Sequence, residues 1–355
     1  MDSGLSANGG DRTPDRPRTG ASPDQGGDPT GTGPSLSSLT SALLRLHRPL
    51  IIAAAFSALI AVVATIGYFV DDRTLVGVPI WHKAAKFGVS ITIYTLTIAW
   101  MLDYLPARSR FVRTLGTIIA VGITIELVFI VVQIIRGQMS HFNVRTVFDA
   151  TMYYSMGGLI TAVWLTNLVL AIVLAFRRLP DRGFAAGIRW GTAIGLIGMA
   201  IAFLMAVGEL EVVDMDAAEA QGLAGAHSVG APDGGPTMPI TGWNTESGDI
   251  RVPHFVGLHA LQAVPLFALG LLLLGRRWPR LRPAGTRVGL VRVFALFWFG
   301  LVVITTVQAI RGQSVAQTDA PTFAALAGLL LLAGLASWAV LARRGGAPST
   351  STPPP

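Results

Sequence analysis

The stretch TLGTIIAVGITIELVFIVVQIIRGQ (114–138) is a long apolar run that closes in the polar motif Gln-x-x-Arg-Gly-Gln. A helix needs about 20 mostly apolar residues to cross the hydrocarbon core of a bilayer, and this run is long enough. Similar runs recur along the chain, and the full set is 49–70, 84–105, 114–135, 147–176, 188–207, 255–274, 288–310 and 322–341. The sequence therefore predicts an all-α integral membrane protein with eight transmembrane helices.

The composition supports this class. Hydrophobic residues make up 52% of the 355 residues and charged residues only 13%, with a mean hydropathy of +0.57. Soluble domains carry about 25% charged residues, so this chain lies far from them. The sequence contains no cysteine, which excludes disulfides, thiolate metal ligands and haem attachment through a Cys-x-x-Cys-His motif.

Basic residues are divided unevenly between the two sides of the predicted bundle. Seventeen Lys and Arg residues fall in segments on one side, whereas the other side has Arg73, Lys83, Lys86, Arg136, Arg145, Arg251 and Arg311. Because cytoplasmic loops carry the excess of Lys and Arg, both termini are predicted to be cytoplasmic and the protein to lie in the plasma membrane. The net charge of +7 is spread over short loops, which argues for the bilayer and against nucleic acid as a partner.

Composition also divides the chain into segments. Residues 1–42 and 344–355 are rich in Gly, Pro and Ser, which predicts disordered cytoplasmic tails. The part between them divides into two four-helix units, 43–180 and 181–343, and the second contains a long extracytoplasmic loop at 208–252. Within that loop, Met238, Ile240 and Trp243 indicate that it packs over something, and loops of this length are often lids or binding elements.

The terminal motif occurs twice. TVQAIRGQ (306–313) ends the seventh predicted span as VVQIIRGQ (131–138) ends the third. The two spans are four apart and run in the same direction, as in a parallel duplication with halves related by a pseudo-two-fold axis along the membrane normal. Whether the repeat is a true duplication stays open. In each copy, Gln and Arg share a helix face and the glycine fits a left-handed helix C-cap, so a purely structural role is the plainer alternative.

Several polar residues are costly where the sequence puts them. Glu126 lies about halfway along the third span, where an ionisable group costs on the order of 2.5 to 3.5 kcal/mol unless it is protonated or paired. Gln133 and Arg136 continue this face outward to form a polar stripe. Lys83 and Lys86 are the only lysines in the chain, and they lie on the side that disfavours basic residues. A function or a buried acidic partner is the usual reason for such an exception.

Three sequence blocks resemble those of a family of uncharacterised bacterial polytopic membrane proteins. The blocks are WHKAAKF (81–87), SHFN (140–143) and GDIRVPHFVGLHALQ (248–262), where the family has leucine at Ile250. The resemblance implies no activity, and it implies that the residue at the position of His82 varies within the family. It does imply importance for ten residues on the extracytoplasmic side, namely Lys83, Lys86, Ser140, His141, Asn143, Asp249, Arg251, His254, His259 and Gln262.

One interpretation is a haem- or metal-binding oxidoreductase with its site at the extracytoplasmic face. Imidazole is the common protein ligand for iron and copper, so His141 and His259 are the leading candidates, with His254 a further one that is less well placed beside His259 on one helix. Arg136, Arg251 and Arg311 would pair with propionates or another anion, Gln133, Gln262 and Gln308 would line the cofactor, and Glu126, Lys83 and Lys86 would be catalytic. Two four-helix halves also resemble haem A synthase, although the histidine placement differs.

Two alternatives stay open. In the first, the chain is a transporter or receptor for a small anionic solute, with the lysines and arginines as the anion site and Glu126 as a proton-coupling carboxyl. In the second, the polar residues are a hydrogen-bonded network that holds the long loop onto the helices. Gly187, Gly191 and Gly195 would allow close helix packing within or between chains, so the oligomeric state also stays open.

Overall fold

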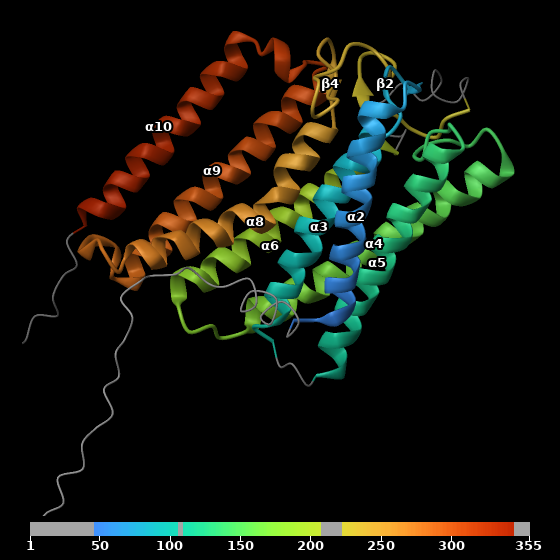
Figure 1. Cartoon of the computed structure of the whole chain (residues 1–355). Helices are drawn as coiled ribbons and strands as arrows, with labels where there is room; N and C mark the ends of the chain where they lie inside the picture. Colours follow the sequence, from blue (N-terminus) through green and yellow to red (C-terminus); the bar gives the residue numbers. More distant parts are fainter. Residues whose placement is uncertain (1–45, 106–108, 207–221, 344–355) are drawn as a thin grey trace, which may run out of the picture. The chain divides into compact units, whose positions relative to one another are not determined.

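The computed structural model describes residues 46–105, 109–206 and 222–343 (Figure 1). Within them, eight helices are long and apolar enough to cross a membrane, which confirms the predicted all-α, eight-span fold. They are α2 (Arg48–Val70), α3 (His82–Leu102), α4 (Arg110–Ile135), α5 (Val147–Phe176), α6 (Arg182–Ile201), α8 (Arg251–Leu274), α9 (Ala284–Ile310) and α10 (Ala320–Ala342). Each overlaps its predicted span, and both predicted tails lie outside the described residues.

Side-chain caps mark where four of these helices begin. The residues before α4, α5, α6 and α10 each accept a hydrogen bond from a backbone N–H of the first turn, and they are Ser109, Thr146, Asp181 and Asp319. Such a cap satisfies a donor that has no partner inside the helix. The remaining elements are short, namely η1 (Ala202–Met205), η3 (Pro279–Leu281), η4 (Val315–Gln317) and the antiparallel strand pairs β1 (Thr74–Leu75) with β2 (Val78–Pro79) and β3 (Ser228–Val229) with β4 (Gly248–Asp249).

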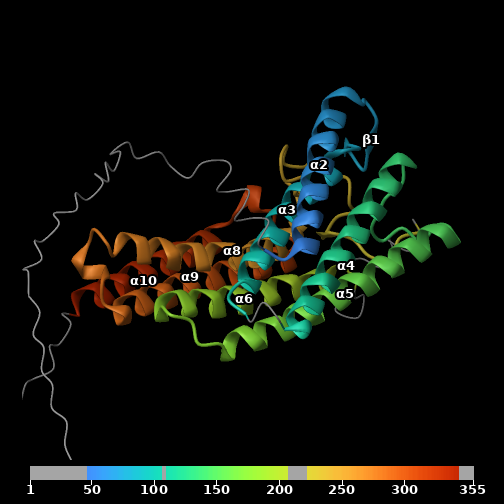
Figure 2. The ribbon, with the colours of Figure 1, turned by 60° about the horizontal axis from the view of Figure 1, so that its bottom comes forward.

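The helices pack in the same order in the two predicted four-helix units (Figure 2). In the first unit α2 contacts α3 and α4, α3 contacts α4, and α4 contacts α5. In the second, α6 contacts α8 and α9, α8 contacts α9, and α9 contacts α10. Each unit also has a two-stranded pair in the connection between its first and second helices. The duplication itself stays a prediction, but the shared packing order is what it would produce.

Glycines bring α6 and α8 into close contact. A Cβ atom at Gly198 would lie 2.2 Å from the carbonyl carbon of Gly257, so only two glycines fit at this crossing. Gly187 and Gly191 also face α8, where an added Cβ would lie 2.6 Å from Ala268 Cβ and 2.8 Å from Ala260 O, respectively. The glycines of this helix therefore serve packing within the chain, and small residues permit the same close approach in other membrane helices.

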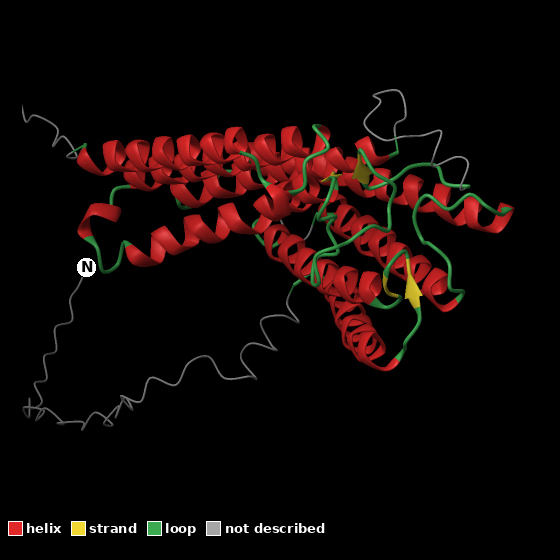
Figure 3. Cartoon of the chain, turned by 90° about the horizontal axis from the view of Figure 1, so that it is seen from above, coloured by secondary structure: helices red, strands yellow, loops and turns green. Residues whose placement is uncertain are grey.

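The connections lie on two sides of the helices. The loop side, as we name it, consists of 71–81, 136–146, 222–250 and 311–319, and it carries both strand pairs (Figure 3, strands in yellow). The arginine side consists of 103–105 with Ser109, 177–181 and 275–283. All the sequence-predicted site residues except Glu126, His259 and Gln262 belong to the loop side or to the first or last two turns of the helices next to it.

Candidate functional site

The two Gln-x-x-Arg-Gly-Gln copies form the same helix cap. Gly137 and Gly312 have φ angles of 70° and 71°, in the left-handed region that glycine adopts without strain. In the first copy Gly137 N donates to Ile134 O and Gln138 N donates to Gln133 O. In the second, the bonds run from Gly312 N to Ala309 O and from Gln313 N to Gln308 O. Both are Schellman caps, so the predicted glycine cap is confirmed.

The side chains of the first copy fasten the end of α4 to the start of α5. Arg136 Nη1 lies 2.5 Å from Asp149 Oδ1, and Gln133 Nε2 donates to the same oxygen at 2.8 Å. Arg136 also donates to Gln133 Oε1 and lies over the ring of Phe148. Thr146 Oγ1 donates to the second oxygen of Asp149. A carboxylate that is almost fully buried thus has donors on both oxygens.

The second copy does the same between α9 and α10. Arg311 Nη2 donates to Asp319 Oδ2 at 2.7 Å, and Asp319 is the N-cap of α10. Gln308 Nε2 donates to Ser314 O and to Thr318 Oγ1. The repeated motif is thus a device that joins consecutive helices. It gives Arg136, Arg311, Gln133 and Gln308, all predicted to bind a cofactor or anion, partners within the protein.

The loop from 222 to 250 covers the loop side and touches both units. Leu223 forms an isolated bridge with Asn143, next to α5, and Ser314 Oγ donates to Asn244 O beyond α9. Gly248 packs so closely on α9 that a Cβ there would lie 2.0 Å from Ala309 O. The predicted packing of this loop over the helices is therefore present among the described residues.

Some side chains in and next to the loop contact other parts of the protein, and others are exposed. Arg251 forms two parallel hydrogen bonds with Asp249, through Nε at 2.9 Å and Nη2 at 2.6 Å, and it also donates to Gly242 O. Trp243 packs edge-on against Phe255 of α8. Ile240, however, is 82% exposed, so the expectation that it packs inward is wrong. Its backbone carbonyl instead faces His82 on α3.

Two predicted metal ligands bind backbone carbonyls of helices. His254 Nδ1 donates to Gly198 O of α6 at 2.8 Å, and His259 Nδ1 donates to Phe255 O one turn earlier, also at 2.8 Å. Farther along the same helix, Gln262 Nε2 donates to Thr97 Oγ1 of α3 at 3.4 Å. These three side chains therefore support contacts of α8 with itself, α6 and α3. The structure does not group them with His141.

His141 instead folds back toward Glu126. Its Nε2 lies 3.5 Å from Glu126 Oε1, and its Nδ1 lies 3.1 Å from Ser140 Oγ. The next residue, Phe142, has a φ of 64°, which is costly for a bulky side chain, and its ring packs edge-on against His227. Strained backbone of this kind persists where the surroundings fix it, and it gathers at functional sites.

The two lysines of α3 have different surroundings. Lys86 Nζ donates to Thr241 O at 2.5 Å, and neighbouring His82 Nε2 donates to Ile240 O, so both hold the loop. Lys83 lies within electrostatic range of Glu126, Asp233 and Arg251. Its ammonium group lies 5.8 Å from the centre of the Phe87 ring, yet it has no hydrogen-bond acceptor among residues 46–105, 109–206 and 222–343.

Sequence reasoning missed the pair formed by His227 and Asp233. Asp233 Oδ2 lies 2.6 Å from His227 Nδ1, and the carboxylate also accepts the backbone N–H groups of His227 and Ser228. Burial lowers the pKa of His227, although the Asp233 carboxylate opposes this. Burial opposes the lowering of the Asp233 pKa, but the donors around it hold that pKa well below its usual range. An Asp-Gly pair such as that at 233–234 indicates a turn but no partner for the aspartate, so the contact has no signal in the sequence.

We define the Glu126 cluster as Lys83, Glu126, His141, His227 and Asp233. The cluster contains a polar atom without a partner: Glu126 Oε2 is buried and has no hydrogen-bond partner among the described residues. Burial, with the nearby charges of Lys83 and His227, lowers the pKa of His141 well below its ordinary value. At neutral pH this imidazole is therefore neutral. The cluster thus has the groups needed to bind an anion and to exchange a proton.

The described residues offer no ready-made metal site. Within 46–105, 109–206 and 222–343 there is no group of three or more His, Cys, Asp or Glu side chains placed to hold a metal ion. Comparisons with known proteins add nothing to this, because no family model, no curated protein and no solved structure matches the chain.

Proposed function

We propose that the chain is a proton-linked binding protein for small anions, acting as a transporter or receptor in the plasma membrane. One observation carries this proposal. In the part of the chain that the structure describes, Arg136, Arg251 and Arg311 are each paired with an aspartate, whereas Lys83 has no hydrogen-bond acceptor and Glu126 keeps one buried oxygen without a donor. Such groups are expensive in a membrane protein and are usually retained for function.

The coupling between anion and proton follows from the shared charge of Lys83. In the free protein, the ammonium group of Lys83 lies within electrostatic range of Glu126, and a nearby positive charge favours the ionised form of a carboxyl group. An anion that binds Lys83 neutralises this charge, so the ionised carboxylate of Glu126 loses its support and binds a proton. His141, 3.5 Å away, is the group that can pass the proton on. Binding of the anion and of the proton therefore favour each other.

The proposed orientation puts the Glu126 cluster on the extracytoplasmic side. Its support is the excess of arginine on the opposite side, which the positive-inside rule assigns to the cytoplasm. Solute would then reach the cluster from outside, past the loop of residues 222–250. The lipid bilayer is the remaining partner.

A haem- or metal-binding oxidoreductase is the weaker proposal. Its candidate ligands His254 and His259 donate their Nδ1 protons to carbonyls of α6 and α8, while His141 lies against Glu126. The propionate-binding role given to Arg136 and Arg311 would compete with their contacts to Asp149 and Asp319. An absorption spectrum of the purified protein with a Soret band lost in His141→Ala would reverse this ranking.

The test of the anion site is a thermal-shift titration of the purified full chain in detergent. The probes are acetate, lactate, succinate, phosphate and sulfate, each added as the sodium salt against chloride at equal ionic strength. We expect at least one probe to raise the melting temperature of the wild type and to lose this effect in Lys83→Met. Arg311→Met is the matched control and should keep the shift, because its partner is Asp319. Equal shifts in wild type and Lys83→Met would sink the proposal.

A further inference from the structure

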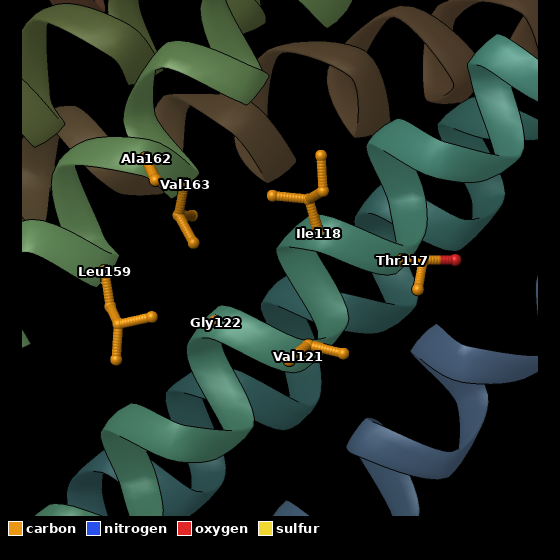
Figure 4. A pocket seen from close by; sticks show the side chains of 7 residues that line it. All are labelled: Thr117, Ile118, Val121, Gly122, Leu159, Ala162 and Val163. Carbon is orange, nitrogen blue, oxygen red and sulfur yellow. The ribbon is translucent and has the colours of Figure 1, made fainter.

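A second feature lies near the middle of α4 and α5, beginning one helical turn from Glu126 toward the arginine side. An apolar groove runs between these two helices, lined by Thr117, Ile118, Val121, Gly122, Leu159, Ala162 and Val163 (Figure 4). Leu159 and Val163 project from α5 toward α4 across it. The one hydroxyl in the lining, that of Thr117, donates to the carbonyl of Arg113 and so offers no free polar group. The groove is therefore suited to a hydrocarbon chain.

Two exposed arginines lie at the arginine-side end of this groove. Arg113 is one helical turn before Thr117 and shares its face of α4, and Arg110 is a further turn away. Neither guanidinium has a hydrogen-bond or ion-pair partner among the described residues. At 1.5 Å per residue, Thr117 lies about 6 Å along the axis from Arg113 and about 10 Å from Arg110, and the headgroup layer on each side of the hydrocarbon core is about 5 to 8 Å thick.

We propose that this groove is a binding site for an anionic phospholipid of the arginine-side leaflet. One acyl chain lies in the groove between α4 and α5, and the headgroup phosphate lies against Arg113 and Arg110. Charge complementarity selects this occupant, because an apolar groove alone would accept any lipid, whereas two unpaired cations at its end favour a negative headgroup. The site is independent of the function proposed for the Glu126 cluster.

The test is photo-crosslinking of the full chain in phosphatidylcholine vesicles. The vesicles contain a small fraction of either phosphatidylglycerol or phosphatidylcholine with a photoreactive acyl chain, and crosslinked peptides are mapped by mass spectrometry. We expect phosphatidylglycerol to label residues 117–122 and 159–163 roughly five-fold more than phosphatidylcholine does, a preference of the size that one or two basic side chains provide. Equal labelling by the two lipids would show ordinary bulk lipid and overturn the proposal without need of any variant.

Variants and a competitor separate the two parts of the site. Arg113→Gln should remove most of the preference for phosphatidylglycerol, and Ala162→Phe should reduce labelling by both lipids, because Ala162 is exposed and a larger side chain there fills the groove. Arg277→Gln, an exposed arginine between α8 and α9, is the matched control and should change neither. Glycerol phosphate added to the vesicles should leave the labelling intact. If it abolishes the labelling, or if Arg113→Gln behaves as Arg277→Gln does, the lipid assignment is wrong.

Discussion

His141 Nε2 lies 3.5 Å from Glu126 Oε1, so the turn that follows α4 reaches back to a carboxyl group well inside the same helix. The backbone of this turn is strained at Phe142, and the contact of the Phe142 ring with His227 helps to hold it. The consequence is a buried acid and a neutral imidazole within reach of one another, beside an ammonium group that has no hydrogen-bond acceptor in the described parts of the chain.

The two copies of the repeated motif should differ in their contribution to stability. Arg136→Met removes the cationic partner of Asp149, whose side chain is only 2% exposed. It should lower the free energy of unfolding by about 2 to 3 kcal/mol, less than the roughly 3 to 5 kcal/mol of a fully buried pair because the Arg136 side chain is 36% exposed. Arg311→Met breaks a pair whose side chains are 49% and 29% exposed, and should cost only about 0 to 1 kcal/mol. Unfolding in mixed detergent micelles measures both. Equal losses would contradict the difference in burial on which this prediction depends.

The crossing of α6 and α8 should tolerate no added methyl group. Gly198→Ala would bring a Cβ to 2.2 Å from the backbone of Gly257, so we expect a large loss of melting temperature or failure to fold. Gly270→Ala on α8 is the control, because its Cβ would meet nothing within 4 Å. Alanine also has the higher helix propensity, so this control should be neutral or slightly stabilising. A mild Gly198→Ala would mean that the two helices can separate.

Stability should fall as the solution is acidified below neutral pH. Burial lowers the pKa values of His141 and His227 in the folded state, so the unfolded chain binds protons first as the pH falls through the ordinary value of 6.5. The folded protein then loses stability progressively, until the pH reaches the pKa values that the two histidines have in the folded state. Asp233 adds its own loss only at lower pH, because its pKa is depressed from the usual carboxyl range.

Melting temperatures at about pH 7.5 and about pH 5.5 test this dependence, since histidine is the side chain that titrates between them. His141→Gln cannot be protonated in this range, so its melting temperature should fall less than that of the wild type. His47→Gln is the comparison, because His47 lies near the start of α2 on the arginine side. Its pKa is also lowered by burial but less than that of His141, so this variant should weaken the pH dependence less than His141→Gln does. A pH dependence in His141→Gln as steep as that of the wild type would contradict the prediction.

The sequence predicted the spans because hydrophobic length is a property of each segment alone. It also predicted the caps at Gly137 and Gly312, since glycine after a terminal arginine has a local meaning. It could not predict that Asp149 and Asp319 receive the motif's arginines, because neither lies within the motif.

The candidate site was predictable only in part, because contacts between distant segments are not a local property of the sequence. Glu126, Lys83 and His141 stand out singly as polar residues in costly places, and the structure brings them together. His254 and His259 stand out equally, yet the fold directs them to carbonyl groups of the helices. The pairing of His227 with Asp233 depends on the path of the loop. Spacing within the sequence does not reveal that path, because its residues have no periodic pattern.

The most direct test of the central claim is a count of protons bound when an anion binds. The probe anion that stabilises the wild type is added to the purified full chain in weakly buffered detergent solution at neutral pH, and proton uptake is measured with a pH indicator. Because Glu126 gains a proton when the anion offsets the positive charge of Lys83, the wild type should take up clearly more protons per anion bound than Glu126→Gln does, by up to about one. Equal proton uptake by the wild type and Glu126→Gln, or anion binding by the wild type with no proton uptake, would contradict the account.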